Sequence, residues 1–162
     1  MSVHATAKLL HRIKQQPVPA VTSPSTMLGN WYATLVAWRK PVVLFVNART
    51  LLPVLTPLAP AVTVLGRFGD QLGAVLTALG APPPFIGVEV DNARSGTLAT
   101  TRDRRVVGSM VDFAFLADHH RRLHPDPDLV ELSVKLAGTP CRPLDAGHGF
   151  PDRELAVLIA TT

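Results

Sequence analysis

The sequence predicts a single α+β domain, residues 1–162, in which a long helix near residues 104–123 packs on an antiparallel or mixed sheet. Short runs rich in Val, Thr and aromatic residues are typical of strands. Other segments repeat apolar residues at steps of three and four, which is typical of helices. The two kinds of segment do not alternate as repeated βαβ units, which disfavours a doubly wound fold. A chain of 162 residues is long enough for one domain with a real core.

The expected strands combine β-branched or aromatic residues with turn residues at their ends. Residues 31–38 and 41–47 flank a basic tip, Arg39 and Lys40, and together they predict a β-hairpin. The second arm is almost continuously apolar, as in a centrally buried strand. Before the hairpin, residues 15–26 are rich in proline and are expected to form an extended, mobile loop. The other segments expected to be strands are 3–6, 85–90 and 97–101.

The expected helices begin at capping residues and end at glycine or proline. Asp103 is a suitable N-cap for the long helix, which stops before Pro125. Residues 50–52 are expected to begin a short helical segment that Pro53 or Pro57 ends. The other segments expected to be helical are 7–14, 67–79, 129–137 and, as helix or strand, 151–159.

The composition is apolar and mildly basic. Hydrophobic residues make up 47% of the chain and charged residues 17%, so disorder of the whole chain is not expected. The formal net charge is +4, and most of the basic residues are arginines, which suit bidentate contacts to phosphate or carboxylate. Arg, Ala, Val and Pro are abundant together, as in proteins from GC-rich genomes. The charge alone is therefore a weak indication of a nucleic-acid partner.

Cysteine usage and hydropathy indicate the compartment. Cys141 is the only cysteine, so an intrachain disulfide and a cysteine-only zinc site are excluded. The first residues contain no long apolar segment typical of a secretory signal, and no run of 18 apolar residues occurs. A cytoplasmic protein without a membrane span is therefore expected.

The start of the long helix predicts a polar site. Its arginines lie where a helix presents free N–H groups and the positive end of its dipole, a combination that favours an anion. Gly108 in the first turns indicates that another backbone or a ligand comes close. Candidate ligand-binding residues come from this helix start and from the end of the 41–47 strand: Asn47, Thr50, Arg102, Arg104, Arg105, Gly108, Ser109 and Asp112.

Three short blocks resemble those of an uncharacterised bacterial family of unknown function. They are Gly-Asn-Trp-Tyr at 29–32, Asn-Ala-Arg-Thr-Leu at 47–51 and Gly-Ser-Met-Val-Asp at 108–112. Their order and spacing agree with the family pattern Gly-x-Trp-Tyr, Asn-x-x-Thr-Leu and Gly-Ser-Met-x-Asp, except that Val111 stands where the family block has Asn. The resemblance implies that the blocks form one shared site or one shared architecture. It implies no established activity.

Three classes of function are compatible with these residues. The first is a binding or regulatory module whose anion site takes a nucleic acid or a phosphate-bearing ligand. The second is a toxin-like enzyme that acts on a nucleotide or nucleic acid, with Ser109, Asp112 and His119 as the candidate catalytic residues. In the third, Ser109 and Asp112 bond Asn47 to fix the strand–helix junction, and the weakly charged surface forms a homodimer.

The remaining patterns give no cofactor or metal site. Neither a Gly-x-Gly-x-x-Gly nor a Walker pattern occurs, and no cofactor is expected. His120 and His124 stand at i and i+4 and are the alternative metal ligands, but histidines near a helix end also complement the dipole. Ser109 and His119 are separated by more than two helical turns, so these two residues cannot form a triad alone.

The aromatic residues of the predicted hairpin have two interpretations. Trp31, Tyr32 and Trp38 can stack on nucleic-acid bases if they face solvent near Arg39. At strand positions flanked by apolar residues such side chains are more often part of the core, and burial is the expectation here.

Overall fold

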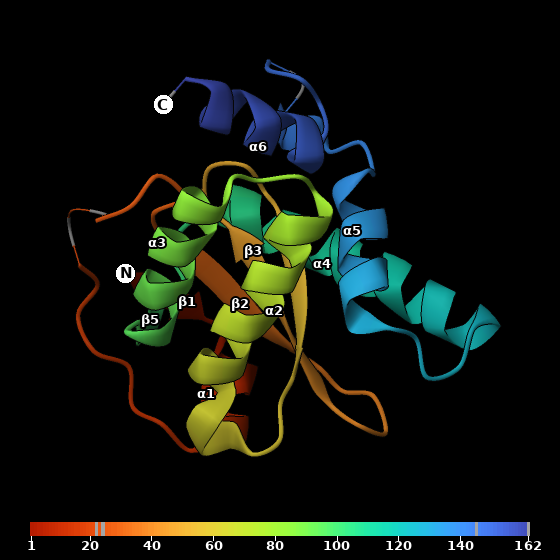
Figure 1. Cartoon of the computed structure of the whole chain (residues 1–162). Helices are drawn as coiled ribbons and strands as arrows, with labels where there is room; N and C mark the ends of the chain where they lie inside the picture. The colour runs from red at the N-terminus through yellow and green to blue at the C-terminus, as the bar shows by residue number, and fades with distance from the viewer. Residues whose placement is uncertain (22, 24, 145, 162) are drawn as a thin grey trace.

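The molecule is built around a five-stranded sheet with strand order β4-β3-β2-β1-β5 (Figure 1). The computed structural model describes residues 1–21, 23, 25–144 and 146–161; Thr22 and Pro24 of the expected 15–26 loop lie outside this description. The strands are β1 (Ser2–Ala5), β2 (Trp31–Val36), β3 (Val42–Asn47), β4 (Pro53–Pro57) and β5 (Thr97–Thr100). The helices are α1 (Ala7–Ile13), α2 (Val64–Ala78), α3 (Pro83–Arg94), α4 (Arg104–Leu123), α5 (Leu129–Ala137) and α6 (Pro151–Ala160), with 3-10 turns at Ala61–Thr63 and Arg142–Leu144.

The sheet joins an antiparallel meander to a parallel strand pair. β2, β3 and β4 follow one another antiparallel, with Tyr32 opposite Val46 in the β2–β3 hairpin. β1 lies between β2 and β5 and runs parallel to both, with Val3 opposite Trp31 and Leu98. The expected α+β fold with a mixed sheet is confirmed, and so is the hairpin.

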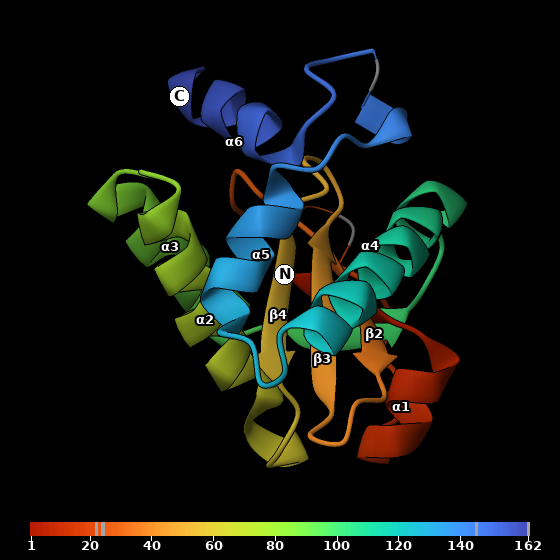
Figure 2. The ribbon, with the colours of Figure 1, turned by 90° about the vertical axis from the view of Figure 1, so that its right-hand side faces the viewer.

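Side chains alternate along the strands and fill two cores, one on each face of the sheet. Trp31 on β2 and Phe45 on β3 face α2, where their rings lie 5.0 and 3.9 Å from the ring of Phe68. Tyr32 and Leu44 belong to the opposite core, which packs under α4. Figure 2 shows α2 and α3 on one side of the sheet and α4 on the other. The expected burial of Trp31 and Tyr32 is confirmed.

The long helix α4 has the bounds that the sequence predicts. Asp103 caps it, because its carboxylate accepts a hydrogen bond from the backbone N–H of Arg105 at 2.8 Å. The apolar stripe at steps of three and four buries Val106, Met110, Phe113 and Ala117. Among the residues that the structure describes, neither α4 nor any other helix has the length and apolarity that crossing a membrane requires.

The strand expected at 85–90 is wrong, because these residues lie within α3. Two prolines occupy the first helical turn, where a missing N–H costs nothing. α3 packs closely on α2: a Cβ on Gly69 would come within 2.8 Å of Arg94 Cγ, and one on Gly73 within 3.2 Å of Val90 Cγ2. This close contact between helices overrides the local β propensity of the segment.

The short helix expected at 50–52 is also wrong. Leu51 adopts a left-handed φ of 56°, which ends a helical path and leads the chain into β4. Prolines at both ends of β4 are tolerated because β4 is an edge strand. Helix α5 covers that edge, where the Ser133 hydroxyl accepts a hydrogen bond from the backbone N–H of Leu55 at 2.9 Å.

Candidate functional site

The start of α4 is fastened to the sheet by hydrogen bonds. The backbone N–H of Asp103 donates to the Tyr32 hydroxyl (3.1 Å), and Arg105 Nη2 donates to the Ala48 carbonyl (2.9 Å). The ring of His4 stacks on Tyr32 at a centroid distance of 4.7 Å. The helix start that the sequence singles out is therefore a fixed junction between β2, the turn after β3, and α4.

Asn47 is fully buried at the end of β3, and its amide bonds within the chain. Its Oδ1 accepts from the backbone N–H groups of Arg49 and Thr50 at 3.0 Å and from the Thr50 hydroxyl at 3.1 Å. Its Nδ2 donates to the carbonyls of Leu28 and Asn30. The first two sequence blocks thus meet in one network, which favours an architectural role for Asn47 and Thr50 over contact with a ligand.

The third block, at the beginning of α4, does not join this network. Ser109 Oγ donates to the Arg105 carbonyl one turn back at 3.2 Å, and Asp112 is exposed. Within the described residues, Asn47 forms no hydrogen bond with either side chain. A Cβ on Gly108 meets nothing within 4 Å, so the close backbone approach expected there is wrong.

Two of the three arginines at this junction are unengaged. Arg102 and Arg104 are exposed, and in the described part of the chain neither has a hydrogen-bond or ion-pair partner for its guanidinium. Arg105 is bound to Ala48 and lies 3.9 Å from the Asp103 carboxylate. The junction therefore keeps two available cations beside a capped helix start.

Ser109 and Asp112 line a small cavity of about 220 Å³ between α4 and the loop after α5. Cys141 and Arg142 contribute to the same lining. Burial raises the pKa of the Cys141 thiol to about 11, and the charge of Asp112 adds to the shift, so the thiol is protonated at neutral pH. The third catalytic candidate, His119, is exposed and does not line this cavity, so the three candidates do not share one site.

His120 and His124 face each other on α4, with ring centroids 4.8 Å apart. They border a polar cavity of about 420 Å³ that Glu131 and Lys135 also line. Lys135 Nζ lies 3.4 Å from His120 Nδ1, and burial together with the Lys135 charge lowers the pKa of His120. In the part of the chain that the structure describes, no group of three His, Cys, Asp or Glu side chains is placed to hold a metal ion.

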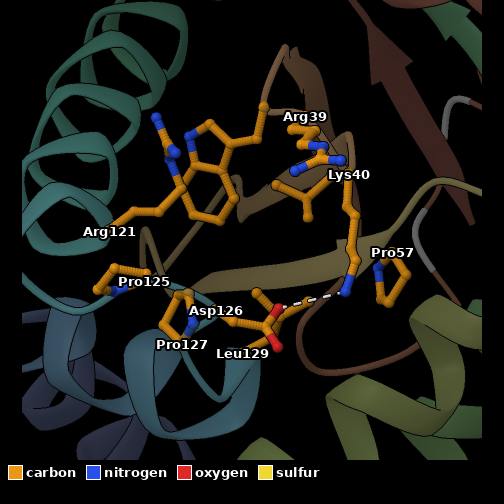
Figure 3. Close-up of a pocket in the computed structure, with 10 residues that line it drawn as sticks. Arg39, Lys40, Pro57, Arg121, Pro125, Asp126, Pro127 and Leu129 are labelled. Carbon is orange, nitrogen blue, oxygen red and sulfur yellow. Dashed lines mark ion pairs between the residues drawn. The ribbon is translucent and has the colours of Figure 1, made fainter.

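The largest of these three cavities lies near the other end of α4, between the β2–β3 loop and the α4–α5 loop (Figure 3). Its volume is about 570 Å³. Figure 3 shows Lys40 and Pro57 on one side and Arg121 and Pro125 on the other. We name it the Trp38 pocket, and it is lined by Trp38, Arg39, Lys40, Val42, Pro57, Arg121, Pro125, Asp126, Pro127 and Leu129.

Two residues that line this pocket, Trp38 and Arg121, carry buried polar groups. β2 ends at Val36, so Trp38 lies in the hairpin loop at the edge of the α4-side core, and its full burial is not observed. The Arg121 guanidinium carbon lies 5.3 Å from the Trp38 ring centroid, a cation–π contact, and Nη2 donates to Asp118. Trp38 Nε1 and Arg121 Nε are buried, and neither has an acceptor within the described residues.

One ion pair joins the two loops on the exposed side of the pocket. Lys40 Nζ lies 3.5 Å from Asp126 Oδ1, as the dashed line in Figure 3 marks. Their side chains are 88% and 85% exposed, so the pair contributes at most about 1 kcal/mol and opens readily. Asp126 also has a left-handed φ of 56°, a conformation that is uncommon outside glycine and enriched at functional sites.

The sequence alone does not identify the Trp38 pocket, because its lining comes from three separated segments. The basic tip and Trp38 belong to the hairpin, Pro57 ends β4, and residues 121–129 end α4 and lead into α5. The repeated prolines at 125 and 127 are a visible signal, but in isolation they predict only a turn.

Comparison with known proteins assigns the chain to a family. The family described as "Domain of unknown function (DUF6933)" has a model that matches residues 2–154, and the chain belongs to this family. All three sequence blocks fall within the match. No curated protein and no solved structure matches the chain. The expected membership of a family of unknown function is confirmed.

Proposed function

We propose that this member of the DUF6933 family is a ligand-binding module whose site is the Trp38 pocket. The observation that carries the proposal is a cavity of about 570 Å³ whose walls are mainly apolar. Ligand sites typically have volumes of about 300–1,000 Å³ and combine apolar walls with a few placed polar groups. Val42, Pro57 and Leu129 are among the apolar walls, and Trp38 and Arg121, which also line the pocket, each carry a buried N–H group without an acceptor among the described residues.

The ionisable groups of this pocket suit binding better than catalysis. They are three cations and the Asp126 carboxylate, which pairs with Lys40 and faces solvent. A general base must be held in contact with the reacting proton, and an exposed carboxylate paired with an ammonium group is not held in this way. The proposal is therefore a binding activity.

Tryptophan fluorescence tests the proposal, because the chain has only two tryptophans. Trp31 is buried under α2, so a ligand in the pocket is expected to change the emission of Trp38 alone. The probes are a library of small fragments that includes acidic, neutral and basic members. The change is expected in the wild-type protein and is expected to vanish in Trp38→Phe.

A matched pair of proline variants locates the binding. Pro125→Phe places a larger side chain at the exposed rim of the pocket and is expected to weaken fragment binding strongly. Pro19→Phe makes the same change at an exposed position in the proline-rich loop and is expected to leave binding unchanged. The proposal fails if no fragment binds, or if Pro125→Phe binds every fragment as tightly as Pro19→Phe does.

A second candidate function is anion binding at the start of α4, which the unengaged Arg102 and Arg104 favour. Free guanidinium groups beside a helix start suit the phosphates of a nucleotide or nucleic acid. The test is a titration with short RNA and DNA at several salt concentrations. Affinity that falls linearly with log salt and is lost in Arg104→Ala supports this candidate, and normal binding by Arg104→Ala removes it.

The proposed homodimer has one observation in its favour. Val111 and Phe115 lie one turn apart on α4 and are 64% and 73% exposed. Adjoining exposed apolar side chains are a feature of surfaces that pack on a partner. Sedimentation velocity is expected to show a dimer that Phe115→Lys converts to a monomer; a monomeric wild-type protein removes the proposal.

A further inference from the structure

We propose that the ligand of the Trp38 pocket is a small organic acid, in which a carboxylate is carried on an apolar body; this inference rests on the proposed function. Three features of the pocket carry it. They are two unsatisfied N–H donors, an unmatched positive charge, and apolar walls beside both.

The first feature is the pair of donors on Trp38 and Arg121. Buried N–H groups nearly always have a partner, and one left without destabilises the folded state. Neither Trp38 Nε1 nor Arg121 Nε can accept a hydrogen bond, so an acceptor is required, and the described residues supply none. The two side chains are in contact, with the guanidinium carbon 5.3 Å from the ring centroid. A planar group with two oxygens suits two neighbouring donors.

The second feature is the charge of the lining. Lys40 pairs with Asp126, and Arg121 pairs with Asp118. Arg39, next to Trp38 in the chain, is exposed and has no ion-pair partner in the part of the chain described. The pocket therefore carries a cation that nothing in its lining balances, and a monoanion matches it.

The third feature is the apolar wall, which selects among anions. The apolar lining residues are Val42, Pro57, Pro125, Pro127 and Leu129. An alkyl or aromatic body removes this surface from water, which is favourable in proportion to the area covered. A nucleic-acid backbone or a free phosphate has no apolar body to place there. The features together select an organic acid over a free phosphate or a nucleic-acid backbone.

Entry of the acid requires a local movement of Arg121. Both donor nitrogens are shielded from solvent, and the guanidinium lies over the indole. The Arg121 side chain is 35% exposed, and it shares Asp118 with Arg122, so its ion pair holds it weakly. Binding is expected to shift this side chain and leave the backbone in place.

Matched probes test the charge requirement. Hexanoate, benzoate and 1-naphthoate are titrated against the wild-type protein at constant ionic strength, together with the primary amide and the amine built on each body. Calorimetry and Trp38 fluorescence are expected to show each acid binding at least about tenfold more tightly than its amide, because charge-assisted hydrogen bonds are stronger. The amines are expected not to bind.

Matched arginine variants test the donors. Arg121→Gln is expected to weaken acid binding by about tenfold or more. Arg122→Gln alters a neighbour that contacts the same Asp118 but does not line the pocket, and it is expected to bind acids as the wild type does. Arg39→Gln, at an exposed position, is expected to weaken acid binding several-fold and serves if Arg121→Gln does not fold.

The outcomes separate this inference from the proposed function. Amides that bind in the pocket as tightly as acids overturn the acid inference and leave the binding module intact. Equal loss of acid affinity in Arg121→Gln and Arg122→Gln indicates general charge attraction and also overturns the inference. If no probe or library fragment of any charge binds, the proposed function itself fails.

Discussion

The two ends of α4 differ in how their polar groups are satisfied. At the start, Asp103 and Arg105 bond to Tyr32 and Ala48, and Asn47 bonds the turns next to them; we call this region the closed junction. Near the end, Trp38 and Arg121 leave two N–H groups without acceptors beside a cavity. Asp103, Arg105 and Asn47 thus hold the fold together, whereas Arg102 and Arg104 have no partner among the described residues. Unpaired donors whose side chains also line a cavity are the better marker of a binding site, since Trp31 Nε1 is equally unpaired among the described residues but lies in the core away from these cavities.

Effects on stability and effects on binding are expected to separate between the two ends of α4. Substitutions in the closed junction are expected to lower the free energy of unfolding, because they leave buried groups unpaired. Substitutions of the unpaired donors are expected to change stability little and ligand affinity more.

The largest effect is expected for Asn47→Ala. This change removes an amide that bonds to Leu28, Asn30, Arg49 and Thr50 and leaves several of these groups buried and unpaired. The free energy of unfolding is expected to fall by about 3 kcal/mol or more. Urea denaturation followed by circular dichroism measures it. A loss below about 1 kcal/mol would show that the junction does not depend on this network.

A smaller effect is expected for Arg105→Ala. Its hydrogen bond to the Ala48 carbonyl is lost at a partly exposed site, so about 1 kcal/mol of stability is expected to disappear. Arg104→Ala is the matched control, since Arg104 has no partner in the described residues, and its effect is expected to stay within about 0.5 kcal/mol. Equal effects of the two variants would contradict the closed junction.

Trp38→Phe is expected to lower the free energy of unfolding by still less. It keeps an aromatic wall in the pocket and removes an N–H that has no acceptor, so the loss of ring area is partly offset. The unfolding midpoint in urea is expected to indicate a change within about 1 kcal/mol. A loss above about 2 kcal/mol would contradict this expectation.

The smallest effect on stability is expected for Asp112→Ala, because the carboxylate is exposed on α4. The change should still be visible at Cys141, whose pKa of about 11 is raised by burial first and by Asp112 second. Removing the negative charge favours the thiolate, so the pKa falls and alkylation at a given pH becomes faster. The alkylation rate is measured between about pH 8 and 10, below the Cys141 pKa of about 11. A rate that is the same in Asp112→Ala and the wild type would mean that the Asp112 charge does not act on the thiol.

Elements with complete local signals are the ones that the sequence predicts well. Asp103 and Pro125 bracket α4, and apolar residues at steps of three and four fill the interval. The β2–β3 hairpin is similarly marked by two apolar runs around its basic tip. Both elements form where they are expected because local propensity and tertiary packing agree.

The segments that are wrongly predicted depend on partners distant in the sequence. Residues 85–90 have β propensity but become helical because Gly69 and Gly73 of α2 let α3 pack closely. β4 is stabilised as an edge strand by pairing with β3 and by Ser133 of α5. The residues that make these contacts lie outside the two segments, so the local sequence pattern does not predict them.

The sequence predicts one of the two candidate sites and not the other. The unengaged Arg102 and Arg104 are where the sequence places an anion site. The Trp38 pocket requires knowledge that the hairpin tip and the loop after α4 lie side by side. Whether a donor such as Trp38 Nε1 finds an acceptor is also a property of the assembled fold and not of the sequence.

The place of β1 between β2 and β5 has a consequence for how the chain folds. β1 pairs with β5, so Ser2 meets Thr97 across more than half of the chain, whereas β2, β3 and β4 pair with their neighbours in sequence. Long-range pairing closes a large loop and slows folding. The meander is therefore expected to form first, and on the ribosome the first strand must wait until Thr100 has emerged before the sheet can close around it.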